Sequence, residues 1–207
     1  MKKQSIIYAV IFFGALWGAI EATLGYVLQL MPHFVSGFIM FPIAALILVA
    51  AYHKTHSAKA LLMVGAIAAM IKSINLFFPM NHWRTINPMV AIVLESLMVM
   101  AVIGVVVHKP LQQKILAFSI ASLGWRLLYL GYMGVQFITT GFLHDNLTSM
   151  SSFIAFVFVQ GLLGAALALM LYYVLEWMRQ HVGKTIQIKP VTATLMVVIA
   201  IALTVIL

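Results

Sequence analysis

The chain has 207 residues, of which 64% are hydrophobic and 8% are charged. Soluble domains carry about 25% charged residues, so the composition excludes a soluble globular domain and indicates an integral membrane protein. The net charge of +8 comes from basic residues scattered singly between apolar segments, which membrane topology explains better than a nucleic-acid-binding surface does. The sequence has no cysteine, so disulfides and thiolate metal sites are excluded.

Apolar segments long enough to cross a bilayer follow one another along the whole chain. We expect an all-α, polytopic transmembrane helical bundle of six to seven spans, forming a single domain over residues 1–207. The Asn87-Pro88 pair combines a good N-cap with a good first helical residue, so we expect the fourth helix to begin there. The expected spans cover residues 5–30, 34–52, 59–78, 88–108, 114–140, 151–177 and 190–207.

The first span contains the sequence GALWGAIEATLG, which places a glutamate at bilayer depth. Gly14, Gly18, Glu21 and Gly25 are spaced so that all four fall on one stripe of an α-helix. Glycines on this stripe allow a neighbouring backbone to come close. We therefore expect the Glu21 carboxylate to point into the protein rather than into lipid.

Lysine and arginine residues are divided very unequally between the two sets of connections. One set holds nine of them and the other holds only Arg84, which predicts a cytoplasmic N-terminus. We separately expect a location in the inner (cytoplasmic) membrane of a prokaryote. The apolar run of residues 5–30 is too long for the core of a signal peptide, so an uncleaved first helix is expected. The nine residues are Lys2, Lys3, Lys54, Lys59, Lys109, Lys114, Arg179, Lys184 and Lys189.

Four ionisable residues lie well inside four different expected spans: Glu21, Lys72, Glu95 and Arg126. A charge at the bilayer centre costs about 2.5–3.5 kcal/mol even on the lenient insertion scale. The four residues must therefore pair, face water or bind a ligand. Counting about 1.5 Å per residue from the helix ends places all of them between the midplane and the outer third, where we expect them to meet.

Polar and aromatic residues near these charges outline a candidate ligand pocket. Glu21 and Glu95 are expected to hold the cationic parts of a small polar or zwitterionic solute, and the two basic residues its anionic parts. Hydrogen bonds are expected from Asn75, Tyr129 and Gln160, and aromatic walls from Trp17, Tyr26, Phe77 and Trp125.

Other functions remain open at this stage. The charges could pair only to assemble the bundle, couple transport to protons, or serve an intramembrane enzyme. We lean against an enzyme, because the sequence has no nucleophile elbow, no HExxH motif and no phosphate-binding glycine loop. His33, His82 and His144 lie one on each expected outer loop and could converge on a divalent metal, since imidazole is a common metal ligand. They form no recognised metal motif, so no metal or other cofactor is expected.

Two segments resemble a known family. The Ala15–Ala19 stretch (ALWGA) is similar to the alanine-x-x-x-alanine motif of the substrate-binding S components of energy-coupling factor (ECF) vitamin transporters, and INPMVAIVLESL is typical of their fourth helix. The resemblance implies that Ala15, Gly18 and Ala19 dock on a transmembrane coupling subunit driven by two ATPase subunits. It also implies an outward-facing pocket for a micronutrient. The family usually has six helices, so a seventh span is a departure.

Overall fold

The computed structural model describes residues 3–29, 33–79, 81–182 and 188–206. Within these ranges the chain is helical and contains no strand. η1 and η2 are short 3₁₀ turns, and η3 is a π-helical turn. The elements are α1 (Lys3–Gln29), α2 (His33–Thr55), α3 (Ala58–Lys72), η1 (Ser73–Phe77), α4 (Trp83–His108), α5 (Leu111–Thr140), η2 (Asp145–Leu147), α6 (Met150–Ile154), η3 (Ala155–Val159), α7 (Gln160–Val182) and α8 (Pro190–Ile206).

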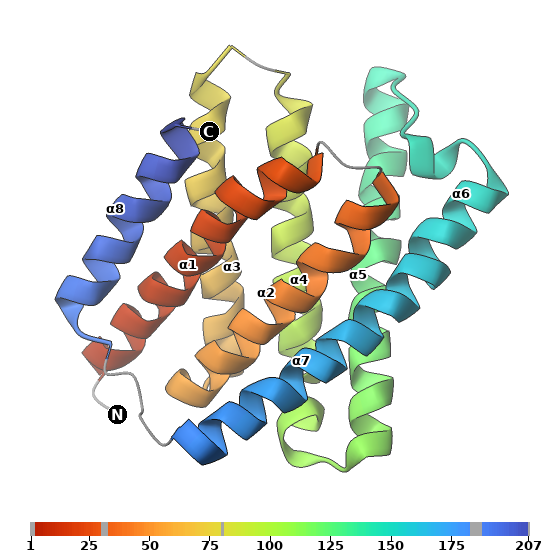
Figure 1. Ribbon diagram of the computed structural model, residues 1–207. Helices are drawn as coiled ribbons and strands as arrows, with labels where there is room; N and C mark the ends of the chain where they lie inside the picture. The colour runs from red at the N-terminus through yellow and green to blue at the C-terminus, as the bar shows by residue number, and fades with distance from the viewer. Residues whose placement is uncertain (1–2, 30–32, 80, 183–187, 207) are drawn as a thin grey trace.

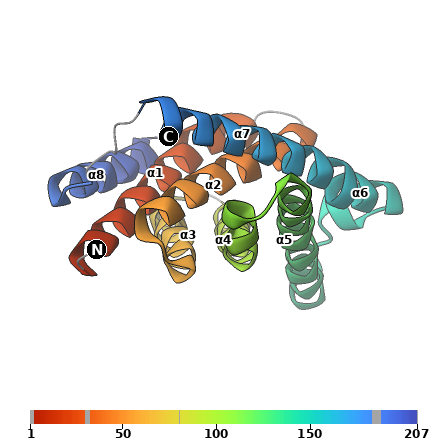
Figure 2. The same ribbon diagram turned by 90° about the horizontal axis from the view of Figure 1, so that it is seen from below.

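The long helices form two layers (Figures 1 and 2). One layer contains α8, α1, α2 and α7 side by side, and the other contains α3, α4 and α5. The layers meet where α1 packs on α3, α2 on α4, and α7 on α5. Elements far apart in the sequence are therefore neighbours, most clearly α1 with α8 and α2 with α7.

Six helices are long and apolar enough to cross a membrane, and α8 is a shorter apolar helix of 17 residues. The π turn η3 joins α6 to α7 without interrupting the sixth of these spans. The expected all-α, polytopic bundle of six to seven spans is confirmed. α1 begins at one end of the bundle and α8 ends at the other (Figure 1). Which end is cytoplasmic stays a prediction from the distribution of basic residues.

The helix expected to begin at the Asn87-Pro88 pair in fact begins one turn earlier, at Trp83. The Asn81 side chain explains the difference, because its Oδ1 accepts a hydrogen bond from the Trp83 N–H at 3.0 Å. The Asn81 carbonyl accepts another from the Arg84 N–H at 3.0 Å. These bonds start the helix, so Pro88 lies inside α4 instead of opening it.

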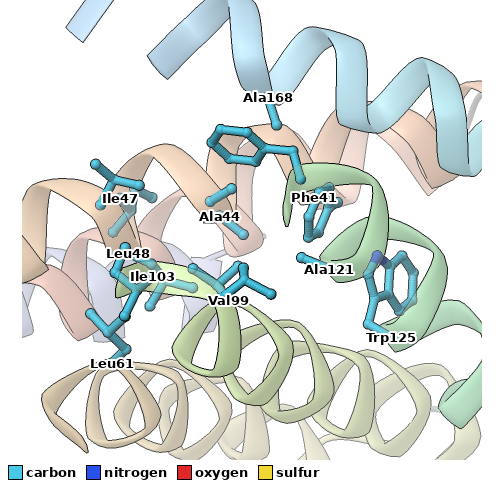
Figure 3. Packing of buried hydrophobic residues seen from close by; sticks show 14 of the residues in the cluster. Phe41, Ala44, Ile47, Leu48, Leu61, Val99, Ile103, Ala121, Trp125 and Ala168 are labelled. Carbon is cyan, nitrogen blue, oxygen red and sulfur yellow. The ribbon is translucent and has the colours of Figure 1, made fainter. Parts of the chain in front are cut away.

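A continuous apolar core fills the space between the two layers (Figure 3). Phe41, Leu48, Leu61 and Ile103 are among its largest fully buried side chains. Lipid tails are as apolar as these side chains, so the association of the helices depends on close packing rather than on burial from water. Packing in the core therefore fixes how each helix is rotated about its axis, and this rotation decides which polar side chains lie close to one another.

Candidate functional site

The four intramembrane charges are all buried. Glu21 is 8% exposed, Lys72 6%, Glu95 5% and Arg126 0%. They come from α1, α3, α4 and α5, so each of four spans contributes one charge. The expectation that these side chains turn away from the lipid agrees with this burial.

Electrostatic interactions link the four charges in the order Lys72, Glu21, Glu95, Arg126. Glu21 interacts with Glu95, and each carboxylate also interacts with one basic residue, Glu21 with Lys72 and Glu95 with Arg126. Within the described residues, neither Glu21 nor Glu95 makes a hydrogen bond or a salt bridge of 4 Å or less. The charges are thus close enough to interact but do not form two closed ion pairs.

A cavity of about 180 Å³ lies between α1, α2, α4 and α5. Its polar lining consists of Glu21, Glu95, Trp125 and Tyr129. Lys72 and Arg126 do not belong to the lining, although both are near it. The remaining lining is glycine, proline and aliphatic or thioether side chains: Gly25, Leu28, Met40, Pro88, Ala91 and Ile92.

The glycine stripe of α1 directs Glu21 into this cavity. A Cβ placed on Gly18 would stand 3.1 Å from Ile71 of α3, so the glycine allows the two helices to approach. One turn beyond Glu21, a Cβ on Gly25 would stand 3.1 Å from Glu21 Oε1. The carboxylate therefore lies along α1 over Gly25, where a Cβ would crowd it.

Arg126 is held toward α7. Its Nη1 donates to the Ser122 carbonyl at 2.7 Å and to Ser122 Oγ at 2.8 Å. Ser122 Oγ donates in turn to the Gly161 carbonyl of α7 at 2.7 Å. The guanidinium carbon also lies 4.5 Å from the centre of the Trp125 ring, a cation–π distance. These contacts bind the arginine into the α5–α7 interface.

Aromatic rings form one side of the cavity. The Trp125 ring stacks on Phe41 at 6.3 Å and meets Phe156 edge-on at 6.0 Å, while Tyr129 lies 5.9 Å from Trp125. Phe156 belongs to the π turn η3, a kind of irregularity that is frequent at functional sites. Within the described residues, the buried Trp125 Nε1 has no hydrogen-bond partner. Trp125 therefore lines the same cavity as Glu21 and Glu95, and its indole N–H, like the two carboxylates, has no hydrogen-bond partner among the described residues.

The other predicted site residues lie away from the cavity lining. Asn75 is half-buried in the 3₁₀ turn η1, and Gln160 is buried at the start of α7. Of the four expected aromatic walls, only Trp125 lines the cavity. Trp17 is in the core, while Tyr26 and Phe77 are 44% and 89% exposed.

The sequence reasoning missed several lining residues. Met40 and Pro88 line the cavity, yet Pro88 was interpreted only as the start of a helix. Nothing in the sequence around Met40 distinguishes it from the thirteen other methionines, most of which lie in apolar helices. Only the tilt of α2 against α4 brings these two residues to the same space.

The proposed partner-docking residues are buried within the chain. Ala15 is 0% exposed and Ala19 6%, and both pack in a small cluster with Ala200 of α8 and Ile71 of α3. Gly18 faces Ile71 as well. In this structure α8 therefore covers the part of α1 on which a coupling subunit was expected to dock.

His82 and His144 are the two expected outer-loop histidines whose side chains the structure describes. Among the described residues, no three His, Asp or Glu side chains are grouped closely enough to hold a metal ion. His144 Nδ1 accepts a hydrogen bond from the Asn146 N–H at 3.3 Å and caps the turn η2. The side chain of His33 lies outside the described residues.

Comparisons of the chain with protein-family models, with curated proteins and with solved structures give no match. The fold and the site by themselves define a polytopic helical membrane protein with an open cavity between four of its helices, lined by two carboxylates and two aromatic side chains.

Proposed function

We propose that this protein binds a small polar solute in the cavity between α1, α2, α4 and α5 and takes part in its uptake. The observation that carries the proposal is the pair of carboxylates, Glu21 and Glu95, which are buried in the cavity lining without a hydrogen-bond or salt-bridge partner among the described residues. A solute with complementary groups would supply the missing partners.

The free energy of burial favours binding over a purely structural role. A buried charge is costly to leave uncompensated, so charges that serve only assembly are expected to touch. Glu21 and Glu95 instead interact with Lys72 and Arg126 without a contact of 4 Å or less. A ligand that binds in the cavity would account for two buried carboxylates without a contact partner, whereas a role in helix association would not.

The position of the cavity suits uptake from outside. Its lining includes Leu28 near the end of α1, Met40 near the start of α2 and Pro88 near the start of α4. These helix ends lie at the side of the bundle that carries Arg84 alone among the basic connection residues and is therefore the predicted outer side.

We further propose that uptake requires partner subunits, as the resemblance to ECF S components implies. The sequence has no phosphate-binding loop, so ATP hydrolysis would have to come from another chain. If a coupling subunit docks on Ala15, Gly18 and Ala19, α8 must first leave α1, because it packs on Ala15 and Ala19.

A second candidate is a proton-coupled transporter that works alone. The electrostatic interaction between Glu21 and Glu95 favours it, because two carboxylates in one cavity form a natural proton-binding pair. Vesicles containing only this protein distinguish the two schemes. Solute accumulation driven by a pH gradient supports the lone transporter, and accumulation only with added coupling and ATPase subunits supports the partner-dependent importer.

Native mass spectrometry of the gently purified protein tests solute binding itself. We expect a co-purified small molecule on the wild-type protein, and its loss from Glu95→Gln at an unchanged or raised melting temperature. Glu176→Gln is the matched control, because the Glu176 carboxylate pairs with His53 and Arg179 away from the cavity. A Glu95→Gln protein that keeps the molecule but melts earlier would favour the assembly role.

A further inference from the structure

We propose that the solute is a small organic cation, a compact amine in its ammonium form, held between the carboxylates of Glu21 and Glu95. This inference rests on the proposed function and specifies the chemical class of its substrate. The geometry that points to it is a cavity whose described lining residues include two carboxylates and no basic side chain.

The basic residues stay outside the lining for a structural reason. Arg126 Nη1 donates twice to Ser122, which ties the arginine to the α5–α7 interface. Lys72 ends α3 and interacts with Glu21 from outside the lining. Among the described lining residues, a zwitterionic solute would therefore find two carboxylates for its cationic part, but only the neutral donors of Trp125 and Tyr129 for its anionic part. An anion would enter a space bordered by two carboxylates, which repel it.

The remaining lining suits an ammonium group that carries a short hydrocarbon body. Tyr129 offers an aromatic ring, which attracts cations through the negative charge of the ring face. The Trp125 ring already faces the Arg126 guanidinium and adds apolar surface to the lining. Leu28, Met40 and Ile92 offer apolar surface. The volume of about 180 Å³ lies below the range of roughly 300–1,000 Å³ that is usual for drug-sized ligands, so the cation must be compact.

The lining is poorly suited to a metal cation. Calcium takes six to eight oxygen ligands, magnesium requires an octahedral set, and transition metals prefer imidazole or thiolate. Glu21 and Glu95 are the carboxylates of the lining as far as the structure describes it, and the hydroxyl of Tyr129 adds one further oxygen. Among the described residues no third His, Asp or Glu joins them. An ammonium ion needs only a few acceptors and so fits this set.

Titration of the purified wild-type protein in detergent tests the charge of the solute. The probes are n-butylammonium, butyrate, n-butanol and sodium ion, and the readouts are calorimetric binding and the melting temperature. We expect n-butylammonium to bind and to raise the melting temperature, and the other three probes to have no effect. This comparison uses one protein, so it does not depend on whether any variant folds.

Variants then locate the binding site. Glu21→Gln and Glu95→Gln are each expected to weaken n-butylammonium binding about tenfold or more, because each removes a charged acceptor from the cavity. Glu176→Gln is expected to bind like the wild-type protein.

Three outcomes would overturn the cation proposal: butyrate binding as tightly as n-butylammonium, sodium alone reproducing the shift, or none of the probes binding. The proposed function fails separately. A neutral or anionic molecule in the native mass spectrum would support the proposed solute binding but contradict the proposal that the solute is a cation. The absence of any co-purified molecule together with no probe binding would remove both.

Discussion

The Glu21 carboxylate lies over Gly25, one turn further along α1, so closely that a Cβ on Gly25 would stand 3.1 Å from Glu21 Oε1. Side chains four residues apart share a helix face, so the residue at position 25 decides where the carboxylate rests. The missing side chain lets Glu21 lie along its own helix and border the cavity that α1 shares with α4.

Gly25→Ala is expected to displace the Glu21 carboxylate by a few tenths of an ångström and to weaken solute binding. Alanine is a better helix former than glycine by about 1 kcal/mol, so the unfolding free energy should stay unchanged or rise. Titration calorimetry and thermal unfolding in detergent measure the two effects. Gly104→Ala on α4 is the control, because a Cβ there meets nothing within 4 Å. Equal affinities of the two variants would contradict the role of Gly25.

Ser122→Ala is expected to loosen the α5–α7 interface. It removes an acceptor for Arg126 Nη1 and the donor to the Gly161 carbonyl, both fully buried. Arg126 Nη1 keeps its bond to the Ser122 carbonyl, so two buried hydrogen bonds are lost. The loss should lower the unfolding free energy by about 1–3 kcal/mol in a detergent denaturation series. The matched control is Ser119→Ala, one turn earlier and only half-buried. A Ser122→Ala protein as stable as the control would show that these bonds contribute little.

Ala200→Leu is expected to force α8 away from α1. Ala200 is 0% exposed and packs with Ala15 and Ala19, so additional methylene groups have no space there. Overpacking of this kind typically costs about 1–3 kcal/mol. Solute affinity should not change, because no residue of α8 lines the cavity. Ile201→Leu, at a position that is 38% exposed, should leave both quantities unchanged. A fall in affinity with Ala200→Leu would instead connect α8 to the site.

Glu176→Gln is expected to weaken the contact between α2 and α7 slightly. Glu176 Oε1 lies 2.8 Å from His53 Nε2 and 2.7 Å from Arg179 Nη1. Because these side chains are partly exposed, the pairs should contribute about 1 kcal/mol or less, and less at high salt. Unfolding measured at low and high ionic strength checks this. A loss of stability that is independent of salt would indicate a packing defect instead.

Much of this arrangement could be predicted from the residues themselves. An 8% charged content and successive apolar segments led to the helical bundle, and the cost of charge in lipid led to the inward placement of Glu21 and Glu95. The position of Lys72 and Arg126 outside the described cavity lining could not be predicted, because it depends on which neighbouring groups these long side chains contact in the folded protein. Ser122 and the nearby Gly161 decided this for Arg126.

The sequence alone determined that the chain is a membrane-spanning helical bundle with four buried charges, because the free energy of transfer into lipid depends on composition and segment length. The tertiary structure alone decided that two carboxylates share a cavity whose described lining residues include no basic side chain, and that α8 covers Ala15 and Ala19. Those outcomes depend on the rotation and tilt of packed helices, which contacts between residues far apart in the chain establish.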